Sequence, residues 1–462
     1  MKEITVYNNK YVLVLGLAKS GTEAAKLLLK LGANVTVNDQ TAFGNNPAAQ
    51  ELADAGADVI CGEHPEELIH QNLFRLVKNP GIRYDHPLVK KAKELGVPVI
   101  TEVELAYEIA ESEMIGITGS NGKTTTTTLT GEMLEGAEVS PLLAGNIGEV
   151  ACRVAQEATS EDVMVVELSS FQLMGIRSFR PKISVILNLY EAHLDYHGTL
   201  EEYKQAKANI FANQTEDDLL IYNADDPAVT ELISQSNAKK IPFSTRSTYE
   251  HGAYVADGWL HLLGEKIIEV EKVALPGEHN IANGLAAAAA AYSAGADVQQ
   301  IAQVLATFDG VKHRLQFVKE VAGRRVVNNS KATNVPATIT ALKAFPAEQI
   351  VLIAGGLDRG NSFDDLIPYV KKNVKGLVAY GETKEKLLQT AEKANIVEVK
   401  MCETLEEAVH EGYKMTAPKD ILLLSPACAS WDQFKTFEER GDRFIKAVEN
   451  LDVKHSDFFT EG

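Results

Sequence analysis

The sequence predicts an α/β protein of three domains, each a mostly parallel sheet covered by helices. The chain has 462 residues, and at roughly 150 residues per domain this length corresponds to about three domains. Short apolar runs alternate with amphipathic segments along the chain, which is the pattern of β-α-β units. Polar, glycine-bearing loops follow several of the apolar runs, as expected at the carboxyl edge of a parallel sheet, where ligands bind.

Composition narrows the class of protein. Hydrophobic residues make up 45% and charged residues 24% of the chain, which is typical of a globular protein with full cores. The net charge of -19 argues against a nucleic-acid partner, which would need a basic surface. No apolar run approaches the roughly 20 residues that span a bilayer, the chain start does not resemble a signal peptide, and the four cysteines are scattered. We therefore expect a cytoplasmic protein with reduced thiols and no membrane partner.

The first predicted domain covers residues 1–101 and begins with a β-α-β unit. A strand over 10–17 leads through a turn into a helix over 22–31, Gly32 is a candidate C-cap, and a second strand follows over 34–39. The turn has the form G-x-A-x-x-G, a degraded dinucleotide-binding pattern that is equally typical of a tight packing turn. If the turn is functional, it holds a nucleotide-like diphosphate, with the V-K-N-P-G loop of residues 77–81 at the same edge. The residues expected there are Leu17, Ala18, Lys19, Ser20, Asp39, Asn79 and Gly81.

The second predicted domain, residues 102–310, contains the strongest motif. An apolar strand over 114–117 runs into T-G-S-N-G-K-T-T and then into a helix, which is the context of a phosphate-binding loop. Gly119 and Gly122 let backbone amides turn toward phosphate, Lys123 supplies a positive charge, and the Thr124 hydroxyl can ligate Mg²⁺. The spacing differs from G-x-x-x-x-G-K-[ST], and a chance Gly-Lys pair in a strand-to-helix turn is the alternative. The phosphate-binding residues are then Gly119, Ser120, Asn121, Gly122, Lys123, Thr124 and Thr125.

Polar residues also follow the strands predicted over 163–168, 183–189 and 219–222. Glu167 and His193 come at the ends of the first two strands, so a parallel sheet would bring both beside the phosphate loop. Together they predict a metal site. Taken singly, Glu167 is equally typical of a cap or an ion pair, and His193 of a core histidine.

The helix predicted over 200–213 carries Lys207 on its apolar side. A buried lysine has a lowered pKa and can react with CO₂ to form a carbamate, which is a metal-ligating anion. From the sequence alone, a lysine whose stem lies along a solvated helix is the favoured alternative. Asn283 lies in a later, alanine-rich helix and can either cap that helix or hydrogen-bond a purine.

The third predicted domain, residues 311–462, has strands over 325–328, 350–354, 377–380 and 421–424. Polar loops follow three of these strands, at 328–334, 355–361 and 425–434. Arg314, Lys331 and Arg359 lie in loops of this domain, and together they suggest an anion-binding cleft, although each alone is more typical of a surface charge.

Seven segments together resemble the Mur ligases of peptidoglycan synthesis, and the resemblance covers the whole chain in order. They are TGSNGKTTTTT, LLAGNIG (142–148), VVELSSFQL (165–173), ILNLYEAHLDYHGT (186–199), LPGEHNIANGLAA (275–287), NNSKATN (328–334) and LLSPACASWDQFKTFEERG (423–441). The phosphate loop and EAHLD are shared with folylpolyglutamate ligases, whereas SKATN and SPACAS are similar to the member of the family that adds D-glutamate.

The resemblance implies a Rossmann-like N-terminal domain, a central P-loop ATPase-type domain and a C-terminal dinucleotide-binding-like α/β domain. It implies an acyl-phosphate mechanism in which ATP activates UDP-N-acetylmuramoyl-L-alanine for attack by D-glutamate, with two Mg²⁺ sites. The implied catalytic residues are Lys123, His193, Lys207 and Lys331. The implied metal ligands are Thr124, Glu167, His193 and Lys207 as a carbamate. ATP would also contact Asn283, Arg314 and Asn329, and the substrates would contact Asn146, Thr333, Asp358, Arg359, Ser430 and Phe437.

One departure matters: the family usually has aspartate where this chain has Asn329, which keeps hydrogen bonding but loses a charge. Two alternatives therefore remain beside a D-glutamate-adding ligase. One is another Mur or folylpolyglutamate-type ligase, and the other is a nucleotide-binding protein with degenerate ligase activity. We expect a monomer that takes part in cell-wall synthesis and thereby in cell shape and division.

Overall fold

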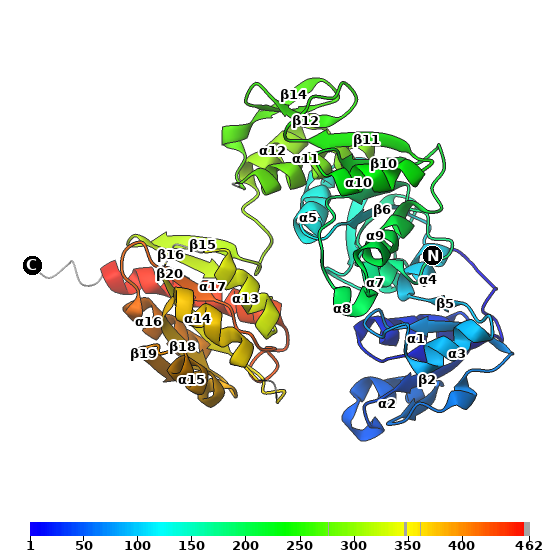
Figure 1. Ribbon diagram of the computed structural model, residues 1–462, viewed down its shortest axis with the longest axis horizontal. Helices are drawn as coiled ribbons and strands as arrows, with labels where there is room; N and C mark the ends of the chain where they lie inside the picture. The colour runs from blue at the N-terminus through cyan, green and yellow to red at the C-terminus, as the bar shows by residue number, and fades with distance from the viewer. Residues whose placement is uncertain (276, 346–348, 361, 457–462) are drawn as a thin grey trace, which may run out of the picture. The chain divides into compact units, whose positions relative to one another are not determined.

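The computed structural model describes residues 1–275, 277–345, 349–360 and 362–456 (Figure 1). The chain divides into two compact units, Met1–Phe308 and Asp309–Gly462. Within the described residues there are three sheets, of five, nine and six strands, and most neighbouring strands are parallel. The predicted α/β class is thus confirmed. Pro276 and Asn361, which belong to segments quoted above, lie outside the described residues, and Asp195 is described by its backbone alone.

The first sheet has the strand order β3-β2-β1-β4-β5, and all its neighbouring strands are parallel. Because β1 lies between β2 and β4, the loops that follow these three strands meet at one edge of the sheet. The strands are β1 (Tyr11–Leu15), β2 (Asn34–Asp39), β3 (Asp58–Cys61), β4 (Leu73–Lys78) and β5 (Val99–Ile100), and the helices are α1 (Lys19–Lys30), α2 (Pro47–Asp54), α3 (Pro87–Glu94) and α4 (Glu102–Ile109).

The second sheet has the order β14-β13-β12-β11-β10-β9-β6-β8-β7. Strands from β7 to β12 in this order are parallel, whereas β12, β13 and β14 form an antiparallel meander that the sequence did not predict. The strands are β6 (Glu113–Thr118), β7 (Ser140–Gly145), β8 (Asp162–Glu167), β9 (Ile183–Ile186), β10 (Leu219–Asn223), β11 (Lys239–Ser244), β12 (Ala253–Ala256), β13 (Trp259–Leu262) and β14 (Glu265–Glu269). The helices are α5 (Lys123–Leu134), α6 (Ala151–Val154), α7 (Ser170–Leu173), α8 (Leu194–His197), α9 (Leu200–Ala208), α10 (Pro227–Leu232), α11 (Glu278–Ser293) and α12 (Val298–Thr307).

The third sheet has the order β15-β16-β20-β17-β18-β19, and only the β15–β16 pair is antiparallel. The three polar loops predicted in this domain follow β16, β20 and β17, which are neighbours. The strands are β15 (Gln316–Val321), β16 (Arg324–Asn328), β17 (Ile350–Gly355), β18 (Val374–Tyr380), β19 (Glu398–Cys402) and β20 (Ile421–Leu424), and the helices are α13 (Val335–Lys343), α14 (Ile367–Asn373), α15 (Lys384–Lys393), α16 (Leu405–Met415) and α17 (Phe437–Ser456).

The first two sheets share one apolar core. Val14 and Val37 of the first sheet belong to the same buried cluster as Met114 and Val166 of the second. Burial of apolar surface is the main favourable term in folding, so a shared cluster explains why residues 1–308 form one compact unit. No described helix is long and apolar enough to cross a membrane.

The cysteines differ in burial. Cys152, Cys402 and Cys428 are buried, Cys61 is partly exposed, and all four thiols are free. Burial raises the pKa of the Cys428 thiol to about 11.

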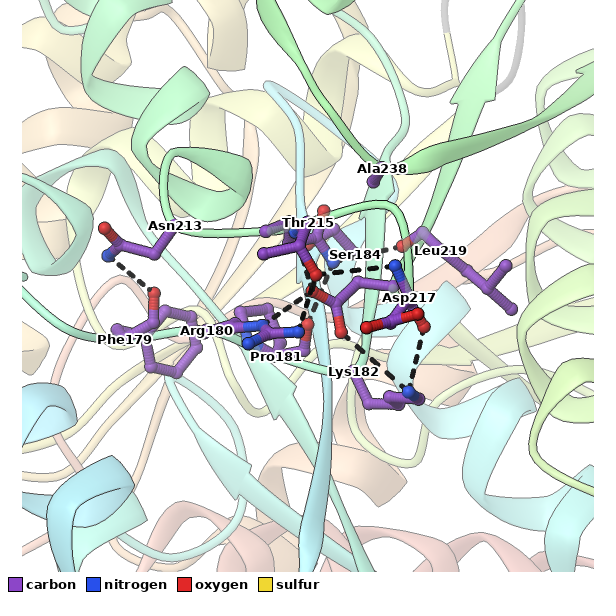
Figure 2. A network of polar contacts seen from close by, with 12 residues as sticks. Phe179, Arg180, Pro181, Lys182, Ser184, Asn213, Thr215, Asp217, Leu219 and Ala238 are labelled. Atoms are coloured by element: carbon purple, nitrogen blue, oxygen red, sulfur yellow. Dashed lines mark hydrogen bonds and ion pairs between the residues drawn. The ribbon is translucent and has the colours of Figure 1, made fainter.

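A polar network ties the segment after α9 to the start of β9 (Figure 2). The Asn213 amide donates to the carbonyl of Phe179 at 3.0 Å, and the Arg180 guanidinium donates to Asp218 at 2.7 Å. The Lys182 ammonium donates to the carbonyl of Asp217 at 2.9 Å. These contacts fix the C-terminal end of the α9 segment against the sheet, and α9 carries Lys207.

Several element boundaries differ from the predicted ones, and three of these differences concern the candidate site. The first helix begins at Lys19 rather than at residue 22, so the turn of the G-x-A-x-x-G pattern is shorter than expected and Ala18 is the N-cap. The strand predicted over 183–189 ends at Ile186. The helix predicted over 200–213 ends at Ala208 and continues as a 3₁₀ turn over Asn209–Phe211.

A buried carboxylate makes a stability test possible. Glu104 in α4 accepts backbone hydrogen bonds from Arg177, Ser178 and Phe179 at 2.8, 2.6 and 3.1 Å. Glu104→Ala leaves these N–H groups without their partner, so we expect the free energy of unfolding of the 1–308 unit to fall by about 3 kcal/mol. Urea unfolding measures this loss. Glu94→Ala, at an exposed position of α3, is the matched control. An equal effect of the two substitutions would contradict the capping role of Glu104.

Candidate active site

The predicted phosphate loop lies between β6 and α5, at the carboxyl edge of the second sheet. Gly122 has φ +83° and is the N-cap of α5, so no side chain obstructs the first-turn amides of this helix. Helix N-termini with free backbone amides bind anions, because the amides and the helix dipole both favour negative charge. The strand, loop and helix therefore have the arrangement that the sequence predicted.

Asn188, which follows β9, holds the loop in place. Its side chain accepts from the amide of Asn121 at 2.8 Å and donates to the carbonyl of Asn121 at 3.1 Å. Its backbone carbonyl accepts from the amide of Ser120 at 3.0 Å. The Ser120 hydroxyl also lies 2.9 Å from the hydroxyl of Tyr203 in α9. The loop conformation is thus fixed from two neighbouring elements.

α11 approaches the loop closely through Asn283. A Cβ atom placed on Gly122 would lie 2.2 Å from Oδ1 of Asn283, which is a collision. Asn283 is buried, and its amide donates to Asn280 at 3.5 Å. Its side chain therefore faces the phosphate loop directly, which is compatible with the predicted contact to ATP.

Glu167 ends β8, next to β6, and is only 2% exposed. Its Oε1 accepts from the amide of Asn146 at 2.8 Å, whereas its Oε2 is buried and has no hydrogen-bond partner within the described protein. A buried carboxylate oxygen without a partner is costly unless a cation or a proton satisfies it. Thr124 is also buried at this edge of the sheet. A carboxylate and a hydroxyl are hard oxygen ligands of the kind Mg²⁺ prefers, so these residues fit the predicted metal.

The structure contradicts the alternative that the sequence favoured for Lys207, a lysine whose stem lies along a solvated helix. The side chain is 1% exposed, so its ammonium does not extend into water. Nζ donates to the carbonyl of Gly119 at 2.8 Å and to the Thr118 hydroxyl at 3.3 Å, and it lies 4.9 Å from the ring centre of Tyr203. Burial lowers the pKa of Lys207 well below its ordinary value, and the positive charge of Lys123 lowers it further.

Lys123 lies over the same loop. Its Nζ donates to the carbonyls of Gly119 and Ser120 at 2.9 and 3.1 Å. His193 is the N-cap of α8 and has a left-handed backbone, φ +55°, which is uncommon for a residue with a side chain. Its ring centre lies 5.1 Å from that of Phe171 and 6.4 Å from that of Tyr203. Tyr203 is thus adjacent to Ser120, Lys207 and His193.

The substrate residues predicted in the first domain meet at one edge of the first sheet. The amide of Leu17 donates to Asp39 at 2.7 Å, and the Asn79 amide donates to the Ser20 hydroxyl at 3.1 Å. The backbone amide of Gly81 donates to Asn79 at 3.1 Å. The Asp39 carboxylate also accepts from the amide of Thr41 at 2.8 Å. Asp39 therefore orders its own loop, in addition to any contact that it makes with a ribose.

In the second unit, a fully buried arginine forms hydrogen bonds to the loop after β16. Arg440 donates to the hydroxyl and the carbonyl of Ser330 at 3.0 and 2.8 Å, and to the carbonyl of Cys428 at 3.0 Å. This guanidinium therefore joins the loops at 328–334 and 425–434. Asn329 accepts from the amide of Leu315 at 3.2 Å and donates to the Ser425 hydroxyl at 3.0 Å.

The other predicted residues of the second unit lie at the same sheet edge or beside it. Nζ of Lys331 lies 5.7 Å from the ring centre of Phe437. The Arg359 guanidinium lies 4.6 Å from the ring centre of Trp431, and Asp358 pairs with Lys386 at 2.7 Å. The remaining positions are Arg314, whose amide bonds to Val311, Thr333, whose amide bonds to Lys331, and Ser430, which is buried.

Sequence reasoning missed three residues of this site: Thr118, Asn188 and Tyr203. Asn188 follows β9, but the strand predicted over 183–189 contained it, so the sheet-edge argument did not identify it. Tyr203 lies four residues before Lys207 and shares its helix face, which is a readable signal. Thr118 is the last residue of β6, and its contact with Lys207 depends on packing between distant segments.

With this geometry established, comparison with known proteins identifies the class. A family model described as the Mur ligase middle domain matches residues 117–291. Models of the Mur ligase glutamate ligase domain and of the Mur ligase MurD-like N-terminal domain match residues 313–428 and 10–101. The chain belongs to the Mur ligase family.

Curated relatives are similar over their whole length. A protein of Geobacillus kaustophilus (strain HTA426), named UDP-N-acetylmuramoylalanine–D-glutamate ligase, is 55% identical over 98% of this chain and 100% of its own length. A protein of the same name from Bacillus mycoides (strain KBAB4) is 56% identical, with the same coverage.

Solved structures show the same fold at low sequence identity. MurF from Acinetobacter baumannii is 17% identical with a TM-score of 0.53, over 96% of this chain and 92% of that chain. The UDP-N-acetylmuramate-alanine ligase MurC from Thermotoga maritima is 19% identical with a TM-score of 0.52, over 96% of this chain and 99% of that chain.

The collision at Gly122 gives a test of the loop. In Gly122→Ala, the methyl group meets Asn283 and the left-handed backbone is strained, so we expect at least about tenfold weaker ATP binding, or roughly 1.4 kcal/mol. Gly136→Ala is the matched control, because Gly136 has φ +82° and nothing within 4 Å of its added Cβ. Calorimetric titration with a non-hydrolysable ATP analogue measures both variants. Equal losses would mean that backbone strain alone, and not the close approach of Asn283, governs binding.

Proposed function

We propose that this protein is an ATP-dependent ligase that adds D-glutamate to UDP-N-acetylmuramoyl-L-alanine in peptidoglycan precursor synthesis. The observation that carries the proposal is 55% identity over 98% of the chain to a ligase of that name. The phosphate loop, with Lys123 and the open N-terminus of α5, supports the use of a nucleotide triphosphate.

The chemistry explains why such a site is needed. A carboxylate is a poor acyl donor until one of its oxygens becomes a good leaving group. ATP transfers its γ-phosphoryl group to the alanine carboxylate, giving an acyl phosphate and ADP. The amine of D-glutamate then attacks the acyl carbon, the C–N bond forms, inorganic phosphate leaves and the amine loses a proton. Three anionic substrates must be held together, so cations and backbone amides provide most of the catalysis.

We assign the following residues to ATP. The amides of residues 119–125 and the Lys123 ammonium hold the phosphates, and Asn283 and Arg314 contact the nucleotide. Asn329 is assigned to ATP on the resemblance to the family, which usually has aspartate at this position. Its two hydrogen bonds, from Leu315 and to Ser425, keep its loop ordered without a negative charge.

Magnesium fits the oxygen donors at the edge of the second sheet, and it supplies charge neutralisation for the phosphates. We propose Thr124 and Glu167 for a first ion, and His193 with carbamylated Lys207 for a second. The lowered pKa of Lys207 favours the free amine, and that amine attacks CO₂. A C–N bond forms, one proton leaves, and the neutral amine becomes an anionic carbamate.

The substrate contacts complete the proposal. The UDP end would lie on the first sheet, at the start of α1 with Asp39, Asn79 and Gly81. Asn146 would touch the reacting phosphate or the acyl substrate. D-Glutamate would be framed by Lys331, Thr333, Ser430 and Phe437, with Asp358 and Arg359 nearby. The proposed domains are residues 1–101, 102–310 and 311–462, and the proposed state is a cytoplasmic monomer without nucleic-acid or membrane partners.

The reaction can be tested with purified protein. We expect phosphate release from ATP only when Mg²⁺, UDP-N-acetylmuramoyl-L-alanine and D-glutamate are all present. L-Glutamate in place of D-glutamate should give no release. A coupled phosphate assay measures the rate, and mass spectrometry of the product verifies addition of one glutamate residue.

Other outcomes distinguish the alternatives. Dependence on lysine or diaminopimelate would indicate a later Mur step, and dependence on a folate would indicate a folylpolyglutamate-type ligase. ATP binding without substrate-dependent phosphate release would support a degenerate ligase. In that case Asn329→Asp is the decisive variant, because it restores the charge that the family usually carries.

The carbamate on Lys207 gives a separate prediction. Lys207→Ala removes the carbamate and should lower kcat by about a hundredfold, the scale of losing a group that supports a metal site. Short carboxylic acids such as acetate should restore part of the rate by occupying the space of the carbamate. A carbonyl resonance from ¹³CO₂ should appear in the native protein and be absent from the variant.

Lys204→Ala is the matched control, because Lys204 lies in the same helix one turn before Lys207 and is partly exposed. We expect it to keep the native rate and the carbamate signal. Full activity of Lys207→Ala, with no response to carboxylic acids, would overturn the role of Lys207.

A further inference from the structure

A second buried lysine lies outside the residues considered so far. Lys78 is the last residue of β4, directly before the loop that carries Asn79 and Gly81, and it is 1% exposed. Its Nζ donates to the backbone carbonyls of Ile82, Pro80 and Asn79 at 2.9, 3.2 and 3.4 Å. The Lys78 side chain thus forms hydrogen bonds to three carbonyl groups of the loop that follows it.

The fourth acceptor belongs to α8, a helix at the edge of the second sheet. Nζ of Lys78 donates to the hydroxyl of Tyr196 at 3.2 Å, and Tyr196 belongs to α8, which begins after His193. The Tyr196 hydroxyl lies 2.8 Å from the carbonyl of Ile82 and 3.1 Å from that of Pro80. Two polar groups from different domains therefore share the same loop carbonyls.

The environment of Lys78 lacks a negative partner. Within the described part of the chain Lys78 forms no ion pair, and burial alone lowers its pKa to about 7. The ring of Tyr84 lies 4.6 Å from Nζ and that of Tyr196 6.0 Å. The other charges nearby are Arg83, which lies over Tyr196 and pairs with Asp85 at 3.1 Å, and Lys93 over Tyr84. Burying an amine without a carboxylate is costly, so the three loop carbonyls and the Tyr196 hydroxyl are what compensates its burial.

The loop that Lys78 gathers is ordered on its other side by the start of α1. Asn79 donates to Ser20 and accepts from Gly81, as described above. Movement of the loop would therefore disturb the predicted diphosphate site of the first sheet. Movement of α8 would disturb His193, at the edge of the second sheet.

We propose that Lys78 and Tyr196 are positioning residues for the UDP-sugar substrate, which join loop 79–82 of the first sheet to the α8 segment of the second. The joint holds the site for the uridine diphosphate end and the site for the acyl end of one substrate at a fixed separation. This inference rests on the proposed function, since it assigns those two ends to the two sheets. Neither residue needs to touch a reacting atom.

The charge state of Lys78 gives the proposal a pH signature. The ammonium form has three N–H donors and the neutral amine has two, so deprotonation loosens the loop. We therefore expect the KM for the UDP-sugar to rise as the pH increases through about 7. The free energy of unfolding should also increase with pH in this range. The folded pKa lies below that of an unfolded lysine, so the unfolded chain binds more protons above pH 7 and stability increases with pH there.

The test compares Lys78→Met and Tyr196→Phe with the native enzyme. We expect the KM for UDP-N-acetylmuramoyl-L-alanine to increase about tenfold in each variant, while the KM for ATP stays within about twofold. The double variant should lose less than the product of the two single losses, because both groups act on the same carbonyls. Lys78→Met should also lose the rise in KM above pH 7.

Lys90→Met, at an exposed lysine of α3, is the matched control and should retain native constants. Tyr196→Phe keeps the lysine and deletes a single hydroxyl, so it remains informative if Lys78→Met fails to fold. Calorimetric binding of the UDP-sugar separates two failures. A native protein that binds no UDP-sugar would overturn the proposed function. Native-like binding and KM in Tyr196→Phe would overturn the positioning role and leave the proposed function standing.

Discussion

Two amines share one carbonyl oxygen at the carboxyl edge of the second sheet, and that contact joins the phosphate loop to α9. The carbonyl of Gly119 accepts from Lys123 at 2.9 Å and from Lys207 at 2.8 Å. The positive charge of Lys123 repels a second positive charge on Lys207 and adds to burial in lowering the pKa of Lys207. Burial and this repulsion together favour the neutral form of Lys207. The same contact ties α5 and α9 to the end of β6. A carbamate on Lys207 would replace the repulsion by attraction to Lys123.

Much of the site could be predicted because its members follow strands. In a parallel sheet, residues at successive strand ends meet at one edge whatever their separation in the chain. This rule brought together Leu17, Asp39 and Asn79 in the first sheet, and the loops after β16, β17 and β20 in the third. The phosphate loop was predicted most completely, since its strand, glycines and helix are adjacent in the sequence.

The features that were not predicted depend on contacts between distant segments. The burial of Lys207 is set by packing of α9 against β6 and by the network between residues 179–184 and 213–219. Periodicity placed Lys207 on the apolar side of this helix, but it did not show whether the ammonium reaches water. The meander of β12 to β14 consists of short strands of mixed polarity, and its pairing becomes evident only when the strands are seen together. The first helix begins at Lys19, so its first turn contains residues that the sequence alone assigned to a loop.

The four thiols differ in burial, so their reactivity can report which part of the chain unfolds. Cys61 ends the edge strand β3 and is accessible without unfolding, whereas Cys152 belongs to the core shared by the first two sheets. Cys428 lies above Arg440 in the second unit, in contact with the loops that would receive the amino acid. An alkylating reagent would therefore label Cys61 first, and each later modification would time the opening of one particular core. The two units could in this way be followed separately in a single unlabelled protein.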